Sequence, residues 1–307
     1  MIQRKQVRKL IGGVRRYGFL RTITGVIRLL RFKILNPQKG TISTITDKLI
    51  VHFEYPRQFI GSLLLFRELI EPEYQFLRKA LCKMSVFFDV GGGIGTYSMC
   101  AATVVSGPIH TFEPLEENLQ TIRTNLIANK MDSKVRLNAA ALSGSEGFGY
   151  ITRCEDAFVS KLENLSKEYS DGSVKVTTID SYCEKNGIES IDVIKIDVEG
   201  HEPEVINGAA NLISNKRIGV IILETDHRLE RFYRSLQDRG GFHFFYYNYR
   251  KNSLEELLPV CERTLLKEPS AFSSNIILIQ QEKLETYRDR FNAGPGVPSW
   301  KVMKPRS

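Results

Sequence analysis

The sequence predicts an α/β fold with a doubly wound, mostly parallel sheet, and two observations lead to this expectation. From residue 84 onward, short apolar runs alternate with segments of helical character. Runs such as Ile218–Leu223 are apolar at almost every position, which is typical of parallel strands that are covered on both faces. The sheet is therefore expected to lie between two layers of helices.

The first 46 residues form a basic arm. They contain eleven Lys or Arg and no Asp or Glu, whereas the other 261 residues carry 32 basic and 35 acidic side chains. The net charge of +8 therefore belongs to the arm, and the body gives no indication of a nucleic-acid surface.

Within the arm, Val26–Leu35 is predicted to be a helix with an apolar and a basic side. Two interpretations stay open. The helix packs on the body with its basic side solvated, or it lies on a negatively charged surface, such as an anionic membrane or a glycan carrier.

Residues 47–83 are expected to lead into the main domain. The partly alternating run Thr41–Phe53 predicts a hairpin, and Gln58–Ile70 and Pro72–Lys83 predict two helices. The main domain is expected over residues 84–282, and residues 283–307 are expected to be a tail that is frayed from Gly294 onward.

Seven strands are expected in the main domain, and the last two of them are expected to form an antiparallel hairpin at the sheet edge. They are Val86–Phe88, Ile109–Phe112, Lys134–Ala141, Ile191–Ile196, Ile218–Leu223, Phe242–Tyr247 and Ser274–Ile279. Helices are expected over Ile94–Val105 and Leu115–Asn129, after Asp180, and up to about Arg239. Residues 143–173 show no clear periodicity, and we expect them to help shape an acceptor pocket.

The composition is that of an ordinary globular protein, with 42% hydrophobic and 25% charged residues. The five cysteines are scattered without a C-x-x-C pair, so they fit neither a disulfide framework nor a zinc site. No apolar stretch approaches the ~20 residues needed to cross a bilayer, and the N-terminus lacks the apolar core of a secretory signal. These features predict reduced thiols and a cytoplasmic location.

The turn at residues 89–95, Asp-Val-Gly-Gly-Gly-Ile-Gly, is the strongest sign of a ligand site. Glycines at 91, 93 and 95 let the backbone approach a ligand closely. Glu113 ends the next apolar strand 22 positions after Gly91, where a carboxylate can accept hydrogen bonds from a ribose diol. The alternative is a glycine-rich turn without a ligand.

Two details favour S-adenosylmethionine over a dinucleotide. A dinucleotide loop has glycine at its sixth position, but counting from Gly91 that position is Thr96. In addition, Asp89 lies two residues ahead of the first glycine, and a carboxylate there suits a ligand that has an ammonium group and no phosphate.

A second group of polar residues follows the strand Ile191–Ile196. A lysine inside a buried strand is costly unless it is paired, and Asp197 is the nearest candidate partner of Lys195 on the same face. Glu199 and His201 come just beyond the strand end. Because ligands of doubly wound sheets lie across the carboxyl ends of the strands, this group is expected to face the glycine turn.

These motifs resemble those of the FkbM-type S-adenosylmethionine-dependent methyltransferases. The matching segments are Lys195–Glu202 with Val205, Gly208 and Ala209, Asp89–Ser98, Phe112–Pro114 with Asn118 and Asn125, and Thr178–Asp180. The resemblance covers about residues 84–225. One departure is Gly92-Gly93, where the family often has Ala-Asn. The resemblance implies a class I, Rossmann-like methyltransferase fold with a seven-stranded, mostly parallel, doubly wound sheet and an antiparallel edge hairpin.

The resemblance also implies a cofactor site for S-adenosylmethionine. Its implied members are Asp89, Gly91, Gly93, Gly95, Thr96, Tyr97, Glu113 and Asn118. Asp89 is expected near the amino-acid end of the cofactor, and Glu113 is expected to take the ribose hydroxyls.

Methyl transfer to an aliphatic hydroxyl needs a general base or a metal, because the hydroxyl is a poor nucleophile until its proton leaves. His201 is the favoured base, although a surface histidine is the plainer interpretation, and His227 is the second choice. The predicted catalytic residues are Lys195, Asp197, Glu199 and His201, whereas His52, His110 and His243 are expected to be structural.

Carboxylates at neighbouring strand ends also raise the possibility of Mg²⁺, which prefers oxygen ligands. Its predicted ligands are Asp197, Glu224 and Asp226. The alternative uses are that Asp197 pairs with Lys195 and that Glu199 caps the next helix.

The expected activity is O-methyl transfer from S-adenosylmethionine to a hydroxyl of a sugar, glycan or other polyol-like natural product. This acceptor class comes from the family resemblance, since a fold does not fix its substrate. Two rivals stay open, a nicotinamide-dependent reductase and a non-catalytic protein that binds a membrane surface through residues 1–46. No nucleic-acid partner is expected, and nothing in the sequence indicates an oligomeric state.

Overall fold

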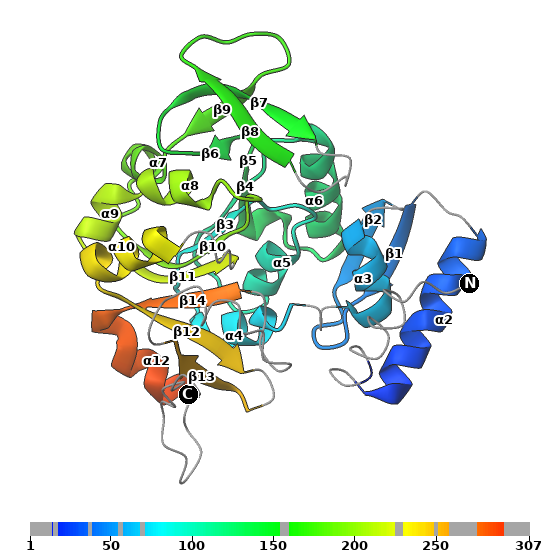
Figure 1. Cartoon of the computed structure of the whole chain (residues 1–307). Coiled ribbons are helices and arrows are strands. Elements are labelled where there is room, and N and C mark those ends of the chain that lie inside the picture. Colours follow the sequence, from blue (N-terminus) through cyan, green and yellow to red (C-terminus); the bar gives the residue numbers. More distant parts are fainter. Residues whose placement is uncertain are drawn as a thin grey trace.

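The computed structural model of the chain describes residues 14, 18–35, 39–54, 58–67, 71–153, 160–224, 230–248, 251–257 and 275–291. An eight-stranded mixed sheet runs through the middle of the body (Figure 1). In spatial order its strands are β13 (Ser253–Glu256), β12 (Phe242–Asn248), β14 (Asn275–Gln280), β11 (Ile218–Glu224), β10 (Ile191–Ile196), β3 (Phe87–Val90), β4 (Ile109–Phe112) and β5 (Val135–Asn138). The five strands from β11 to β5 are parallel, and β14, β12 and β13 pair with their neighbours in antiparallel fashion.

The α/β fold with a mostly parallel sheet is confirmed, and so is the antiparallel pairing of the last two expected strands, which are β12 and β14. The strand number of seven and the place of this pair at the sheet edge are wrong. β14 lies between β11 and β12, and an eighth strand, β13, occupies the edge beside β12. The sequence of β13 hid it, because of its four residues only Leu254 is buried and two are acidic. Short, charged strands are common at exposed sheet edges, where they discourage pairing with other chains.

Alternating side chains of the central strands pack into two separate hydrophobic cores, one on each face of the sheet. Phe87 and Val193 belong to the first core, and Phe88 and Ile194 to the second. Helices α4 (Glu73–Ala80), α5 (Thr96–Ala102), α6 (Glu116–Ala128) and α12 (Leu284–Phe291) cover the first face, and α7 (Ile179–Asn186), α8 (Glu202–Asn207), α9 (Ala210–Ser214) and α10 (Glu230–Gly240) cover the second. Short 3₁₀ turns at Asp132–Lys134 and Gln281–Lys283 precede β5 and α12.

The segment that lacked a clear period forms a second, four-stranded sheet above the carboxyl end of β4 and β5 (Figure 1). Its strands in spatial order are β6 (Ala141–Leu142), β9 (Val174–Thr177), β7 (Gly147–Arg153) and β8 (Ser160–Ser166). A shift of register between Phe148 and Tyr150 disturbs the alternation of β7. Since such irregularities break the period of two, the sequence pattern did not reveal this sheet.

The N-terminal elements form an outlying layer beside α6 (Figure 1). They are α2 (Phe19–Leu35), β1 (Lys39–Ser43), β2 (Ile50–Glu54) and α3 (Gln58–Phe66). The hairpin expected over Thr41–Phe53 is confirmed as the antiparallel pair β1–β2. The helix expected at Val26 begins at Phe19, and no helix in the described part of the chain is long and apolar enough to cross a membrane.

Asn125 on α6 joins this layer to the glycine turn. Its side-chain amide donates to the carbonyl oxygens of His52, at 3.1 Å, and Ile94, at 2.8 Å, and its oxygen accepts the His52 N–H. The side chain is fully buried, so one asparagine satisfies three backbone groups that water does not reach. The hairpin and the turn are thereby held in register.

The C-terminal part contains more ordered structure than the expected tail suggested. Helix α12 begins at Leu284, and its Phe291 stacks on Phe76 of α4 with ring centroids 4.9 Å apart. Residues 292–307, with the fraying expected from Gly294, lie outside the described residues. The domain boundaries predicted above therefore stay predictions.

Candidate functional site

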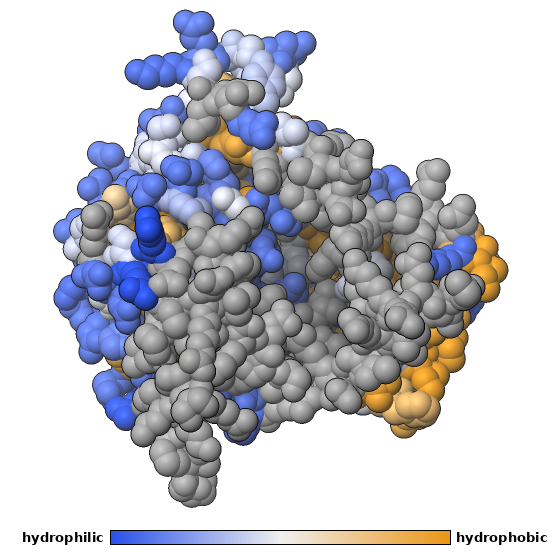
Figure 2. Space-filling view, viewed as in Figure 1, coloured by the Kyte–Doolittle hydropathy of each residue, from blue (hydrophilic) through white to orange (hydrophobic). Residues whose placement is uncertain are grey.

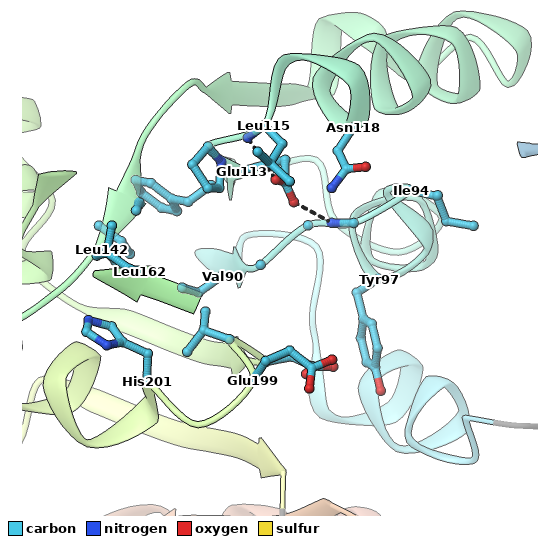
Figure 3. Close-up of a pocket in the computed structure, with 18 of the residues that line it drawn as sticks. Val90, Ile94, Tyr97, Glu113, Leu115, Asn118, Leu142, Leu162, Glu199 and His201 are labelled. Atoms are coloured by element: carbon cyan, nitrogen blue, oxygen red, sulfur yellow. Dashed lines mark hydrogen bonds between the residues drawn. The ribbon is translucent and has the colours of Figure 1, made fainter. Parts of the chain in front are cut away.

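A cavity of about 230 Å³ opens at the carboxyl ends of β3, β4 and β10 (Figure 3). Its walls come from the glycine turn, the turn after β4, the loop after β10, the start of α4 and the second sheet. Nine of the predicted site residues line it, namely Gly91, Gly93, Thr96, Tyr97, Glu113, Asn118, Asp197, Glu199 and His201. Asp89, Gly95, Lys195 and Glu224 are not among the lining residues.

The glycine turn has no room for a side chain at Gly91. Gly91 has a φ of +82°, and a Cβ there would lie 2.0 Å from the Asp197 carbonyl oxygen. Gly93 and Gly95 also have positive φ, at +56° and +83°, and Gly95 precedes the first turn of α5. The turn therefore packs directly against the start of the loop after β10.

The departure from the usual Ala-Asn has a local explanation. A Cβ at Gly92 would come within 2.5 Å of the Thr111 methyl group, so the side chain on β4 fills the space that alanine would use. Gly93 has the left-handed conformation that asparagine tolerates better than most residues. The pair Gly92-Gly93 therefore fits the turn as closely packed as it is.

Asp89 lies beneath the turn rather than in the cavity wall. Its Oδ2 accepts hydrogen bonds from the N–H and the hydroxyl of Ser98, which ties β3 to the first turn of α5. Burial raises the pKa of Asp89 to about 6.

Glu113 links the glycine turn to the turn after β4 by hydrogen bonds. One carboxylate oxygen accepts the Gly93 N–H and the other accepts the Leu115 N–H, both at 3.0 Å (Figure 3). Burial raises the pKa of this carboxyl, although the bonds from the two backbone amides and the Asn118 side chain oppose the shift. These three donors leave about one of the four acceptor positions of the carboxylate for a ligand.

Thr96 and Tyr97 at the start of α5 are bound to the first turn of α4 and to a residue just ahead of it. The Tyr74 hydroxyl donates to Thr96 Oγ1 at 2.7 Å, and the Tyr97 hydroxyl donates to Glu71 Oε2 at 2.8 Å. The two tyrosine rings meet edge to face, with centroids 4.6 Å apart.

Lys195 is 1% exposed and is bound as predicted. Its Nζ lies 3.2 Å from Asp197 Oδ2 and 3.2 Å from Asn275 Oδ1, and it stands 5.4 Å from the centre of the Tyr97 ring. Burial opposes its charge, but the nearby carboxylates of Asp197 and Glu71 outweigh burial and raise the pKa of Lys195. The predicted pairing with Asp197 is confirmed.

Carboxyl groups with raised pKa values gather around this lysine. Burial and the charge of Asp197 raise the pKa of Glu199 and of Glu224 to about 7 each. Burial and the charge of Glu73 raise the pKa of Glu71 to about 8. We call Glu71, Tyr97, Asp197 and Glu199 the acidic end of the cavity.

His201 lies at the other end, beside Leu142 and Leu162 (Figure 3). Its Nε2 is 2.9 Å from the Ser143 hydroxyl, and burial lowers its pKa. The histidine is therefore neutral near pH 7. We call Leu142, Leu162, Phe112 and His201 the apolar end of the cavity.

The loop after β10 is held by a carboxylate, but not by the expected one. Glu202 is 3% exposed, and its Oε1 accepts the N–H groups of Val198 and Gly200 at 3.1 Å each. Glu199 instead has a φ of +56° and lines the cavity. Glu202 thus has the backbone-binding role that was considered for Glu199.

The histidines expected to be structural lie away from the cavity. Nδ1 of His110 is 2.7 Å from the Tyr182 hydroxyl, and burial lowers the pKa of His110 to about 4. Nδ1 of His243 is 3.1 Å from Glu256. His52 faces Asn125 with its backbone, whereas His227 lies outside the described residues.

The magnesium prediction gains no support from the structure. Among the described residues no group of three or more His, Cys, Asp or Glu is arranged to hold a metal ion. Asp226, one of the three predicted ligands, lies outside them. Asp197 is bound to Lys195, which was the alternative use considered for it.

Sequence reasoning missed Glu71, Tyr74, Ile151 and Leu162, which also line the cavity. Glu71 and Tyr74 lie ahead of the glycine turn in a segment without a motif, and Ile151 and Leu162 belong to the second sheet. The sequence around Glu71 and Tyr74 gives no signal of a ligand site, because the helix Glu73–Ala80 mixes polar and apolar residues in the ordinary way.

Comparison with known proteins agrees with these observations. The profile of the methyltransferase FkbM domain matches residues 89–250. A hexuronic acid methyltransferase, AglP, of Haloferax volcanii is 27% identical over 144 residues, which are 45% of this chain and 55% of that protein. The chain thus spans about half the length of this relative.

Two solved structures also resemble the chain. An FkbM methyltransferase from Methylobacillus flagellatus has a TM-score of 0.42 at 14% identity, with 72% of this chain and 54% of that one covered. An O-methyltransferase from Bacillus cereus in complex with SAH has a TM-score of 0.41 at 16% identity, with 69% and 81% covered. The family assignment rests on the profile match over more than half of the chain, and it confirms the predicted resemblance: the chain belongs to the FkbM family of methyltransferases.

Proposed function

We propose that the chain transfers a methyl group from S-adenosylmethionine to a hydroxyl oxygen of a sugar, glycan or related polyol. One observation carries this proposal. Glu113 and the residues after β10 line the same cavity, from opposite sides of a glycine turn in which Gly91 has no room for a side chain. Membership of the FkbM family and the similarity to the hexuronic acid methyltransferase of Haloferax volcanii support it.

The cavity residues fit the cofactor chemically. S-adenosylmethionine has a flat base, a ribose diol and an amino-acid end with a sulfonium, an ammonium group and a carboxylate. The apolar end, with Leu142 and Leu162, suits the base, and Glu113 next to it can accept from the diol. The acidic end offers the negative charge that a sulfonium and an ammonium group favour.

This orientation changes the role of the second sheet. Residues 143–173 were expected to shape the acceptor pocket, but Ile151 and Leu162 line the cavity together with the apolar end. We infer that this sheet covers the base of the cofactor. The acceptor hydroxyl then approaches at the acidic end.

The same orientation favours Glu199 over His201 as the general base. When bound, the cofactor supplies an electrophilic methyl group on its sulfonium. Glu199 lies at the acidic end with a pKa raised to about 7, close to the value at which a base is most effective at neutral pH. His201 lies beside Leu142 and Leu162, where it positions Ser143 and the loop.

Lys195 and Tyr97 are assigned supporting roles. Lys195 holds Asp197 in place, and its buried charge keeps part of the acidic end ionised. Tyr97 donates to Glu71 and thereby fixes that carboxyl in the cavity wall. Each residue keeps a side chain oriented without contacting the reacting oxygen.

The cofactor is tested by calorimetric titration with S-adenosylhomocysteine, with NADH in parallel. We expect S-adenosylhomocysteine to bind, and Glu113→Gln should weaken this binding about tenfold or more, because one carboxylate oxygen becomes an NH2 group that cannot accept a hydrogen bond from the ribose or from a backbone N–H. Glu116→Gln is the matched control, since Glu116 is an exposed acid three residues further on, paired with Arg123. Binding of NADH alone would instead support the reductase.

The acceptor is tested by following a mass gain of one methyl group on panels of neutral sugars and hexuronic acids. The name of the relative makes hexuronic acids the first class to try. Neutral sugars are the matched comparison. The carboxyl groups of Glu71 and Glu199, when ionised, repel an anionic acceptor but not a neutral one. Cofactor binding without methyl transfer to either panel would contradict the acceptor class and leave the cofactor site intact.

A further inference from the structure

Helix α2 has an apolar stripe that faces solvent. Seven of the twelve large hydrophobic side chains that are exposed in the described part of the chain lie on this one helix. Six of them repeat at helical spacing, namely Phe19, Leu20, Ile23, Ile27, Leu30 and Ile34, with exposed fractions from 40% to 81%. At about 100° per residue they share one side of the helix, and Figure 2 shows an apolar surface at this edge of the molecule.

The opposite side of the same helix is firmly packed. Thr22 and Gly25 are buried, and a Cβ on Gly25 would lie 2.0 Å from the Leu65 carbonyl oxygen of α3. Phe32 packs on Phe53 of the hairpin, with ring centroids 5.6 Å apart. The helix cannot turn its stripe inward without losing these contacts.

Arg28 strengthens the same orientation. Its guanidinium donates to the Leu64 carbonyl oxygen at 2.6 Å, and burial lowers its pKa. One basic residue of the helix thus serves the packed side. The apolar stripe is a stable feature of the surface and not a misplaced core.

The charges around the stripe identify what it binds. Arg31 and Lys33 lie on either side of it at helical spacing, and α2 contains no acidic residue. The whole of residues 1–46 has eleven basic side chains and no acidic one. An apolar stripe flanked by cations complements an anionic lipid surface, where acyl chains lie beneath negatively charged headgroups.

We propose that α2 lies in the headgroup region of an anionic membrane, with its stripe in the acyl boundary. This inference is independent of the proposed methyl transfer. It places α2 on one leaflet, and it accounts for the contrast between the basic first 46 residues and the balanced body.

The test is co-sedimentation of the whole chain with vesicles of phosphatidylcholine alone and of phosphatidylcholine mixed with phosphatidylglycerol. We expect binding to the mixed vesicles only. The double variant I27D/L30D should abolish it, since two charges enter the stripe. The matched control is Ile127→Asp, which changes a residue on α6 that is 65% exposed and should leave binding unchanged.

A second pair of variants separates charge from apolar contact. R31Q/K33Q should weaken binding to the mixed vesicles by about fivefold for each lost charge. Thermal unfolding of every variant confirms that it is folded. Failure of the wild-type chain to sediment, or equal binding by I27D/L30D, would overturn the proposal. Light scattering that shows a dimer broken by I27D/L30D, without vesicle binding, would assign the stripe to a second copy of the chain.

Discussion

The glycine turn and the acidic end form two walls of one cavity, but they are built in different ways. The turn is a local structure, in which Gly91, Gly93 and Glu113 lie within 23 residues and the Gly93 N–H donates to the Glu113 carboxylate. The acidic end and the buried Lys195 behind it bring together Glu71, Tyr97 and Asn275, which are far apart in the chain. The first depends on backbone shape and the second on burial and charge. Substitutions in the two walls should therefore affect ligand binding and catalysis in different ways.

The largest effect is expected for Gly91→Ala. The new Cβ would lie 2.0 Å from the Asp197 carbonyl oxygen, in a left-handed conformation that costs a non-glycine residue about 1 kcal/mol by itself. The turn and the loop after β10 would have to separate. We expect the affinity for S-adenosylhomocysteine to fall more than a hundredfold, as measured by calorimetry.

Gly187→Ala is the control for the backbone conformation. Gly187 ends α7 with a φ of +65°, and nothing lies within 4 Å of the added Cβ. It should cost about 1 kcal/mol of unfolding free energy and leave ligand affinity unchanged. Equal loss of affinity in the two variants would show that the contact with Asp197 is unimportant.

Next in size is Glu199→Gln at the acidic end. Removing a general base lowers kcat by about 10²- to 10⁴-fold, while S-adenosylhomocysteine affinity should stay within a few-fold of the wild type. Because a base must be deprotonated, kcat/KM of the wild type should fall as the pH drops below about 7. His201→Asn is the comparison, and it should retain most of the activity.

The position of the acid limb distinguishes the two candidates. Burial lowers the pKa of His201 from its ordinary value of 6.5, so a rate governed by this histidine would stay level until the pH is below that value. A limb near 7 that disappears in the glutamine variant supports Glu199. A limb well below 6.5 that disappears in His201→Asn would reverse the assignment.

The difference between the two walls also explains what the sequence could predict. The glycine turn, Glu113 and the pairing of Lys195 with Asp197 follow from local spacing and from strand periodicity. Glu71 carries no local signal, because its position in the cavity is set by α4 packing on α5. β13 and the second sheet were not predicted for another reason. Short or irregular strands lack the alternating repeat that sequence analysis detects.

A smaller effect is expected for Asp89→Asn beneath the turn. The pKa of Asp89 is raised to about 6 by burial, against an ordinary value of 3.8, so the folded state binds a proton that the unfolded state has lost between these pH values. The contribution of this group to the unfolding free energy is fully present below about pH 4 and is lost as the pH rises through about 6. The wild type should therefore lose about 2 kcal/mol relative to the variant over this range.

Urea unfolding of both proteins at several pH values between 4 and 7 measures this difference. The asparagine does not titrate, so its curve should be flatter, although other groups shift both curves together. Asp192→Asn is a suitable control, because the Asp192 carboxylate also accepts a backbone N–H, that of Val86, but is less buried. Parallel curves for wild type and Asp89→Asn would show that Asp89 is not the titrating group.

The smallest effect compares two tyrosines that join α5 to the segment before it. Tyr97→Phe removes the bond to Glu71 at the acidic end, and Tyr74→Phe removes the bond to Thr96 beside the glycine turn. Each should cost about 1 kcal/mol of unfolding free energy.

The two variants should differ in their effect on ligand binding. The bond from Tyr97 lowers the pKa of Glu71, so its loss should leave that carboxyl more fully protonated and the acidic end less negative. We therefore expect Tyr97→Phe to weaken S-adenosylmethionine binding more than S-adenosylhomocysteine binding, because only the former carries the sulfonium charge, and Tyr74→Phe to affect both ligands equally. An equal loss for both ligands in both variants would mean that the two walls contribute to cofactor binding by the same means.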